Sequence, residues 1–475
     1  MKKTKIIATY GPSVNTQAKV SKLIQSGVNL FRVNCSHGKT EDFLKAANII
    51  RGGIKKANDS PVGILFDISG PKLRLGHFDK EVPVKPGSVF TLTSGKTDIQ
   101  KKIISVNHPA IIKSIKKGER LFVDDGNIIF QITEVGKNGI KIKALNAGKL
   151  LSAKGVNLPD TDLKIPTITQ KDKEDIKTAV RANVDYIALS FVRSGNDIIE
   201  AKKIIKRYGG SQRVIAKLEK KEAIQDIDEI MLLADGVMVA RGDLGVELPP
   251  EDLPKLQKKI IKLANRHHKP VIVATQMMES MRFSPRATRA EINDVASAVF
   301  DFVDAVMLSA ETATGEYPVE VVETMSNVIE TTESDSQRPD VELETHLIKS
   351  EIPLAIAEAV SNIDNRCDLK LIFAYTTSGF TAELISNLFP QQPIIALTPN
   401  KKVQSGLSLY RSVYSVEITH PKSFNDMLKT VEKINREKKL VKKGDKVVIT
   451  GGVPFGSTVA TNFTMIHEIG VHKKS

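Results

Sequence analysis

The sequence predicts an α/β protein with a (β/α)8 (TIM) barrel, a small inserted β-barrel lid domain and a C-terminal open α/β domain. Three observations support this prediction. Eight short apolar runs alternate with helical segments, hairpin-like sequence separates the third run from the fourth, and four further strand-like runs follow the eighth.

The eight apolar runs are typical of strands buried on both faces, because near-continuous Val, Ile and Leu characterise a parallel sheet. Amphipathic segments such as residues 252–268 lie between them, as a strand-helix alternation requires. Eight such units predict a closed barrel, whose functional side chains gather at the carboxyl ends of the strands. The predicted strands are residues 4–10, 29–35, 61–67, 185–191, 213–219, 236–241, 270–276 and 305–311.

The sequence between Asp67 and Asp185 breaks this rhythm. Alternating β-branched positions and Asp-Gly turns indicate hairpins there, so we expect an inserted all-β module. Because it leaves the carboxyl end of a strand, the module should lie over the barrel mouth as a lid. The predicted domains are residues 1–68 and 158–340 for the barrel, 69–157 for the lid and 341–475 for the C-terminal domain.

After the eighth barrel strand, the acidic stretch that starts at Glu316 predicts a helix followed by a link between domains. Beyond this link, short apolar runs alternate with helical segments again, which favours a smaller open α/β domain. Its predicted strands are residues 369–379, 393–400, 411–418 and 445–452.

The composition favours a protein of a reducing compartment. Two cysteines, Cys35 and Cys367, cannot build a disulfide framework. We find no secretory signal and no apolar stretch near the roughly 18 residues of a membrane span, so we expect a soluble, cytoplasmic protein with no membrane partner. The formal net charge is +14, but the lysines are scattered among acids and only 5% of residues are aromatic. We therefore expect no nucleic-acid partner.

The strongest cluster of reactive side chains lies at two neighbouring strand ends. Lys217 and Glu219 are two residues apart on a strand, so both side chains leave the same face. Asp243 follows the next strand, and two carboxylates from adjacent strand ends can hold Mg²⁺ together with substrate oxygens. Gly242 beside Asp243 leaves backbone N–H groups open to an anion. Two unrelated surface acids and a salt-bridging lysine are the alternative interpretation.

Other strand ends add polar groups. Arg32 and Asn34 share one strand face with Ser36 after them, and a guanidinium at a barrel mouth suits a phosphate or carboxylate. His37 could face a nucleotide, although a lone histidine is more often simply packed or exposed. The remaining candidates are Asp67, Lys72, Arg74, Thr275, Ser309 and Glu311, which leaves only the first and fourth strand ends without a candidate.

Several familiar motifs are missing from the sequence. It has no GxxxxGK[ST] phosphate loop and no GxGxxG after a strand, so a nucleotide would have to bind in another way. No Cys/His spacing suits zinc, and no GxSxG elbow occurs.

Together these segments closely resemble the pyruvate kinase family over essentially the whole chain. The motifs that match, in family order, are TKIIATYGPS, NxxRVNxSHG, FDxxGPKxR, SAKGVNLP, TxxDKEDI, SFVR, AKLE, ARGDLGVE, ATQMMESM and LSAETAxGxYP. The resemblance implies phosphoryl transfer from phosphoenolpyruvate to ADP, giving pyruvate and ATP in glycolysis, by a cytoplasmic homotetramer.

The resemblance also implies roles for individual residues. Glu219 and Asp243 match the Mg²⁺ ligands, with Mn²⁺ as a substitute. Lys217, Arg32, Arg74 and Thr275 match catalytic positions. The substrate-binding positions are Arg32, Lys217, Gly242, Asp243 and Thr275. The nucleotide positions are Asn34, His37, Arg74 and Lys154, and the monovalent-cation positions are Asn34, Ser36, Asp67 and the carbonyl of Ile68.

The sequence departs from the family pattern at a few positions. Lys72 stands where the family usually has Glu near a bound K⁺, and Ile68 replaces a common Thr. Because an ammonium can stand in for a monovalent cation, we expect turnover without K⁺. In the alternative, Lys72 turns to solvent and the site holds K⁺ as usual. Phe380 replaces a usual basic residue in the loop 376–382, so activation by a sugar phosphate is in doubt.

Two other functions are compatible with parts of the sequence. A Mg²⁺-dependent aldolase of phosphoenolpyruvate or pyruvate chemistry would use the same paired carboxylates, but it would lack the inserted module and Lys154. A basic nucleic-acid-binding protein would need its lysines and arginines clustered on one face.

Overall fold

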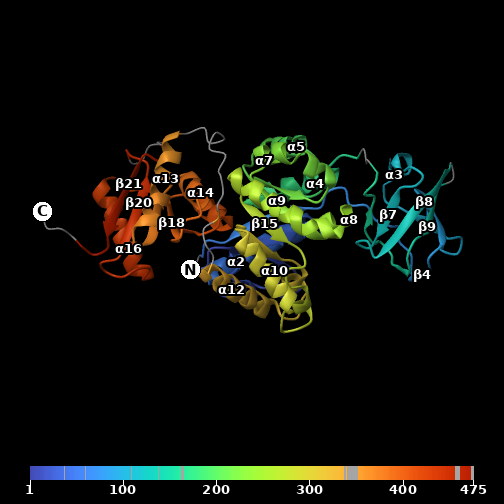
Figure 1. Cartoon of the computed structure of the whole chain (residues 1–475), viewed down its shortest axis with the longest axis horizontal. Coiled ribbons are helices and arrows are strands. Elements are labelled where there is room, and N and C mark those ends of the chain that lie inside the picture. Colours follow the sequence, from blue (N-terminus) through green and yellow to red (C-terminus); the bar gives the residue numbers. More distant parts are fainter. Residues whose placement is uncertain are drawn as a thin grey trace.

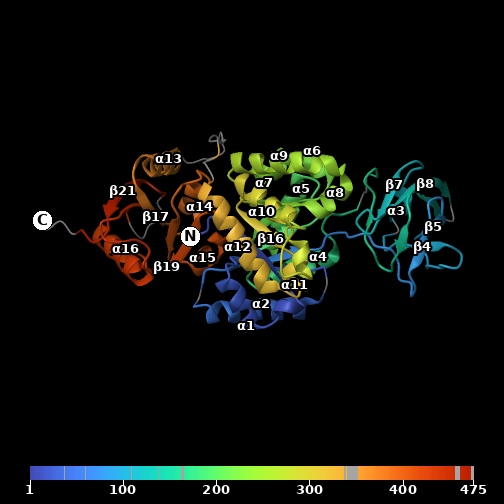
Figure 2. The same cartoon turned by 60° about the horizontal axis from the view of Figure 1, so that its bottom comes forward.

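The computed structural model describes residues 1–36, 38–58, 60–108, 110–136, 139–161, 165–335, 339, 351–454 and 460–471. Three bodies lie in a row along its long axis, with the barrel between the inserted module and the C-terminal domain (Figures 1 and 2). No helix in these ranges is long and apolar enough to cross a membrane.

The central body is the closed parallel barrel that the sequence predicts. Its strands pair in the order β1-β16-β15-β14-β13-β12-β3-β2, so the chain runs around the barrel once and closes between β1 and β16. The strands are β1 (Lys5–Tyr10), β2 (Leu30–Asn34), β3 (Gly63–Ile68), β12 (Tyr186–Leu189), β13 (Arg213–Leu218), β14 (Gly236–Ala240), β15 (Val271–Ala274) and β16 (Ala305–Leu308).

Helices surround the barrel because each connection returns the chain to the same end of the sheet. Their apolar faces and the outward strand residues form one core, while inward residues such as Ile7, Leu65 and Met238 fill the barrel interior. The helices are α1 (Gln17–Gln25), α2 (Thr40–Lys56), α4 (Gln170–Arg181), α5 (Gly195–Arg207), α6 (Lys221–Gln225), α7 (Ile227–Leu233), α8 (Arg241–Glu247), α9 (Leu253–Arg266), α10 (Arg289–Phe300), α11 (Ala310–Ala313) and α12 (Pro318–Asp335).

The inserted module leaves the carboxyl end of β3 and returns before α4, and it has its own apolar core. It contains a six-stranded sheet in the order β11-β7-β8-β9-β5-β6, a two-stranded sheet β10-β4, and one short helix, which the sequence did not indicate. Its elements are β4 (Val82–Val84), β5 (Val89–Thr93), β6 (Ile103–Ser105), α3 (Ala110–Ser114), β7 (Arg120–Val123), β8 (Ile128–Gly136), β9 (Gly139–Ala144), β10 (Gly148–Leu150) and β11 (Val156–Asn157).

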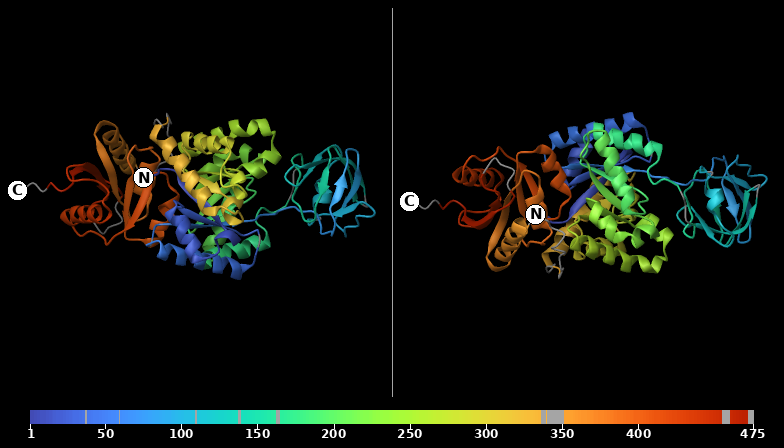
Figure 3. Two further views of the ribbon diagram at one scale, coloured as in Figure 1. Left: turned by 90° about the horizontal axis from the view of Figure 1, so that it is seen from below. Right: turned by 90° about the horizontal axis from the view of Figure 1, so that it is seen from above.

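The C-terminal domain holds an open sheet in the order β19-β18-β17-β20-β21 at the opposite end of the barrel (Figure 3). The four strands that the sequence predicts are parallel to one another. A fifth strand, β21, is antiparallel to β20 and is not among the predicted ones. The elements are α13 (Glu351–Arg366), β17 (Leu369–Tyr375), α14 (Phe380–Ser386), β18 (Ile394–Thr398), α15 (Lys401–Gly406), β19 (Val413–Glu417), α16 (Phe424–Lys438), β20 (Lys446–Gly451) and β21 (Phe463–Glu468).

Candidate active site

A polar cavity of about 510 Å³ opens at the carboxyl ends of the barrel strands. Parallel strands bring their ends to one rim, so residues far apart in the chain meet there. The lining residues are Arg32, Asn34, Ser36, Asp67, Ser69, Lys72, Ser190, Phe191, Lys217, Glu219, Met238, Ala240, Asp243, Ala274, Thr275, Met307 and Ser309.

The ammonium group of Lys217 is buried among oxygen atoms. Its Nζ lies 2.7 Å from Oε1 of Glu219 and 3.2 Å from Oδ1 of Asp67. It also donates a hydrogen bond of 2.7 Å to Oγ of Ser190. Burial alone would lower the pKa of Lys217, but the two carboxylates outweigh burial and raise it above its ordinary value. Lys217 therefore presents a fixed positive charge to the cavity.

Glu219 has one oxygen that no hydrogen bond satisfies. Its Oε2 accepts the backbone N–H of Phe191 at 2.8 Å, whereas its buried Oε1 has no hydrogen-bond partner and only the ion contact with Lys217. Burial raises the pKa of Glu219. A buried carboxylate oxygen without a hydrogen-bond partner, in the same cavity as Asp243, suits a divalent cation that takes its other ligands from substrate and water. No cluster of three or more His, Cys, Asp or Glu that could hold a metal ion occurs in the described ranges.

Arg32 forms the second cationic group of the cavity. Its Nε donates to Oδ2 of Asp67 at 2.7 Å, and Nη1 donates to Oγ1 of Thr9 at 3.1 Å. Burial tends to raise the pKa of Asp67, but Lys217 and Arg32 lower it below its ordinary value. Asp67 thus stays ionised between two cations and fixes both of them at the cavity wall.

The turn after β15 forms a polar cradle with the start of α8. Thr275 has a φ of +73°, which is uncommon for a β-branched residue. Its Oγ1 accepts the backbone N–H of Gly242 at 2.9 Å. A Cβ on Gly242 would lie 3.6 Å or more from Thr275, an ordinary contact, so the protein itself does not require a glycine there. The missing side chain leaves space beside Thr275, which lines the cavity.

The residues expected at a monovalent-cation site also lie together. Asn34 pairs with Asp67 in the β2–β3 register, and Oδ1 of Asn34 accepts the N–H of Ser36 at 3.1 Å. Ile68 is buried and ends β3. Lys72 reaches the same cavity from the chain that leads into the inserted module.

Two lid residues that we expected at the site do not line this cavity. Nη1 of Arg74 donates to the carbonyl of Ala153 at 3.1 Å, and Nζ of Lys154 lies 2.7 Å from Oδ1 of Asp124. Both cations are thus engaged inside the inserted module. His37 lies outside the described residues.

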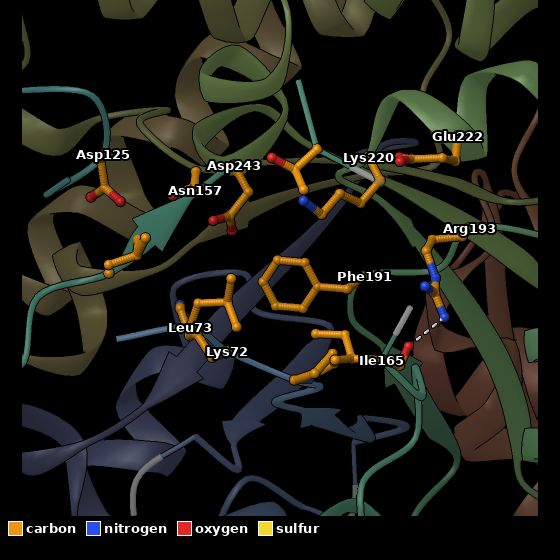
Figure 4. Close-up of a pocket in the computed structure, with 14 residues that line it drawn as sticks. Lys72, Leu73, Asp125, Asn157, Ile165, Phe191, Arg193, Lys220, Glu222 and Asp243 are labelled. Carbon is orange, nitrogen blue, oxygen red and sulfur yellow. Dashed lines mark hydrogen bonds between the residues drawn. The ribbon is translucent and has the colours of Figure 1, made fainter. Parts of the chain in front are cut away.

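A second cavity of about 680 Å³ lies between the inserted module and the barrel (Figure 4). Phe191 stands near its centre in this view, with Lys72 and Leu73 on one side and Asp243 on another. Its walls come from both chain segments that connect the module to the barrel, from the residues that follow β12 and β13, and from the starts of α6 and α8. This cavity adjoins the polar cavity, because Lys72, Phe191 and Asp243 line both of them.

Sequence reasoning missed contributions from the first and fourth strand ends. Thr9 holds Arg32, and Ser190 and Phe191 contact Lys217 and Glu219. Ser190 and Phe191 belong to the SFVR motif, but a serine and a backbone amide indicate no chemistry in a sequence. Their role becomes visible only where the barrel brings them beside Lys217 and Glu219.

Family models match two parts of the chain. Residues 1–322 match the model described as "Pyruvate kinase, barrel domain", and residues 354–467 match "Pyruvate kinase, alpha/beta domain".

Similar proteins match nearly the whole length. The chain is 40% identical over 471 residues to a pyruvate kinase of Thermotoga maritima, covering 99% of this chain and 100% of that protein. It is 39% identical to a pyruvate kinase of Geobacillus stearothermophilus, covering 98% of this chain and 80% of that protein. A crystal structure of a pyruvate kinase from Cryptosporidium parvum superimposes with a TM-score of 0.91 at 35% identity, covering 98% of this chain and 96% of that one. The chain therefore belongs to the pyruvate kinase family of glycolytic phosphotransferases, which use a divalent cation to transfer phosphoryl from phosphoenolpyruvate to ADP.

Proposed function

We propose that the polar cavity at the barrel mouth carries out this transfer in the present chain. The observation that carries the proposal is the convergence of Lys217 and Arg32 with the carboxylates Glu219 and Asp243 in one cavity. Phosphoryl transfer has a loose transition state, so the protein's main work is positioning and charge stabilisation. Two fixed cations and a metal-binding pair of carboxylates supply both.

In the reaction, the bond between phosphorus and the enol oxygen of phosphoenolpyruvate breaks, and a bond forms to a terminal oxygen of ADP. Arg32 binds the phosphoryl group, and Lys217 stabilises the negative charge on the phosphoryl and the developing enolate. Gly242 and Asp243 orient the substrate carboxylate. The enolate then takes a proton at its terminal carbon, next to the hydroxyl of Thr275, and becomes pyruvate.

Glu219 and Asp243 would hold the divalent cation, which when bound supplies a Lewis acid for the enolate and carboxylate oxygens. We propose Mg²⁺ as this ion, with Mn²⁺ as a functional substitute, because carboxylate oxygens suit both.

We propose that the inserted module, residues 69–157, moves as a lid that brings Arg74 and Lys154 to the nucleotide phosphates. Both side chains are now engaged inside the module, in contacts that are partly exposed and so cheap to break. Asn34 and His37 complete the nucleotide site. A closed lid also excludes water, which would otherwise compete with ADP for the phosphoryl group.

We further propose that Lys72 makes K⁺ unnecessary. Asp67 already lies between Lys217 and Arg32, and Lys72 lines the same cavity. Adding K⁺ beside an ammonium at contact distance would cost about 4 kcal/mol at intermediate dielectric. Initial rates in tetramethylammonium and potassium buffers test this point. We expect equal rates for the unmodified protein and a K⁺ requirement for Lys72→Glu, and strong K⁺ activation of the unmodified protein would contradict it.

The reaction itself is tested by coupling pyruvate formation to lactate dehydrogenase. We expect pyruvate only when phosphoenolpyruvate, a divalent cation and a nucleoside diphosphate are all present, and comparison of the diphosphates gives the preference. Pyruvate release at the same rate without any diphosphate would indicate a hydrolase or lyase instead. A cytoplasmic homotetramer is the assembly we propose, and sedimentation equilibrium measures its subunit number.

A further inference from the structure

The three oxygen atoms around Lys217 differ in one respect that bears on its role. Glu219 and Asp67 are carboxylates with other tasks, since Glu219 lies beside Asp243 in the proposed metal site and Asp67 holds Arg32. Ser190 is the neutral partner of Lys217 and accepts a hydrogen bond of 2.7 Å from it. A lysine ammonium has three N–H donors, and three oxygen atoms already lie within 3.2 Å of Nζ before a substrate arrives.

Binding of substrate must change this arrangement. At least one N–H of Lys217 has to turn toward the phosphoryl group, and a cation beside Glu219 would weaken the pairing of that carboxylate with the lysine. A hydroxyl group can hold the ammonium through this change without neutralising its charge, because the dipole of a hydroxyl carries no net charge. Ser190 can therefore keep Lys217 aimed at the reacting group.

The position of Ser190 is itself fixed by the barrel. Leu189 pairs with Ala216 in the β12–β13 register, so Ser190 and Lys217 follow side by side. Ser190 is 3% exposed, and its Oγ also lies 3.3 Å from Oδ1 of Asp67. The hydroxyl thus bridges Lys217 and Asp67 within a buried network.

Phe191, the next residue, also has a conformation that its surroundings fix. Phe191 adopts a φ of +55°, a strained conformation for a bulky side chain, and its N–H donates to Glu219 at 2.8 Å. Gly70 lies so close that a Cβ there would approach the Phe191 ring to 2.8 Å. Figure 4 shows the ring between the connection to the lid and the side of Asp243. The backbone hydrogen bond to Glu219 and the close packing of the ring against Gly70 therefore fix the conformation of Phe191.

We propose that Ser190 is a positioning residue for Lys217, and that the backbone of Phe191 independently positions Glu219. This inference rests on the proposed role of Lys217 in phosphoryl transfer. The two residues have different roles. The side chain of Ser190 orients Lys217, whereas the backbone N–H of Phe191 orients the proposed metal ligand Glu219.

A double-mutant cycle with a metal-binding measurement tests the proposal. Residues that orient a catalytic group typically contribute about 10–100-fold to activity. We expect Ser190→Ala to lower kcat by roughly that factor, to leave the Mn²⁺ affinity measured by electron paramagnetic resonance within about twofold, and to change the KM for phosphoenolpyruvate less than kcat. In a Lys217→Met background the same serine substitution should cost nothing further, because no ammonium remains to be positioned.

Ser386→Ala is the matched control. Ser386 is a buried serine in the C-terminal domain whose hydroxyl donates to the carbonyl of Arg411 at 2.6 Å. Its loss should change the melting temperature about as much as Ser190→Ala and leave kcat unchanged. Native kcat for Ser190→Ala, additive effects in the cycle, or a parallel loss of Mn²⁺ affinity would overturn the positioning role. Near-native turnover of Lys217→Met would instead overturn the proposed function.

Discussion

The lid and the C-terminal domain are attached to the same barrel in opposite ways (Figure 3). The apolar core inside the barrel continues into the C-terminal domain, since Tyr186 of the barrel and Leu409 of the C-terminal domain belong to one cluster. The lid has a separate core. The polar cavity that we propose as the active site lies at the lid end. The barrel therefore shares a continuous apolar core with the C-terminal domain, whereas the lid, at the end that carries the polar cavity, packs around a core of its own.

Charged contacts repeat this difference. Arg411 of the C-terminal domain is 3% exposed, donates its backbone N–H to Asp304 at 3.0 Å and lies 3.5 Å from Glu333 of the barrel. The ion pairs that we find in the described part of the lid join lid residues to one another or to Asp160, in the chain segment that returns to the barrel. Their side chains are partly exposed. Breaking a buried pair is costly, while an exposed pair contributes little. The two ends should respond very differently to loss of one charge.

The largest effect on stability is expected at the C-terminal junction. Arg411→Met should lower the free energy of unfolding by about 3–5 kcal/mol, because it removes the buried guanidinium that lies 3.5 Å from Glu333. The matched lid variant is Lys149→Met, which breaks the exposed pair with Glu81 and should cost less than about 1 kcal/mol. Urea denaturation of both variants measures the difference, and equal losses would refute the contrast between the two ends.

On the lid side we expect an effect on activity without a comparable effect on stability. Lys154→Ala should reduce ADP-dependent turnover roughly 10–100-fold, since a charge-assisted contact contributes about 1.5–3 kcal/mol. Exchange of the methyl protons of pyruvate, driven by a phosphate analogue in place of nucleotide, should suffer less. Equal losses in turnover and exchange would show that Lys154 serves the enolate half of the reaction.

The smallest expected effect is a pH dependence at the C-terminal junction. Burial, reinforced by Lys2, lowers the pKa of Lys5 to about 7, and its Nζ donates to the carbonyl of Val413 at 2.6 Å. Between pH 7 and 10 the unfolded chain therefore binds a proton here that the folded chain releases, so stability from this group rises with pH.

The comparison of the unmodified protein with Lys5→Met isolates this contribution. The difference in unfolding free energy should shift in favour of the unmodified protein by up to about 1.4 kcal/mol per pH unit between pH 7 and 9. A constant difference over this range would mean that Lys5 keeps its proton in the folded state.

The sequence was sufficient to predict the parts of the structure that rest on local patterns. Eight apolar runs predicted the barrel strands, and the two-residue spacing of Lys217 and Glu219 predicted that both would face one cavity. Contacts between segments that are distant in the sequence could not be predicted. Thr9 with Arg32, Ser190 with Lys217, and Arg411 with Glu333 depend on how the barrel closes and how domains dock. The engagement of Arg74 and Lys154 inside the lid also depends on the lid position, which no motif encodes.

The most direct test of the account is the turnover of Lys217→Met together with its melting temperature. The ammonium of Lys217 lies beside the carboxylates of Asp67 and Glu219 and is the proposed stabiliser of the transferring phosphoryl group. Its loss should therefore reduce kcat by on the order of 10²–10³. The variant should still fold as three domains and bind Mn²⁺, because Asp67 keeps Arg32 and Glu219 keeps the N–H of Phe191. A folded Lys217→Met protein with near-native kcat would contradict the assignment of phosphoryl transfer to this cavity.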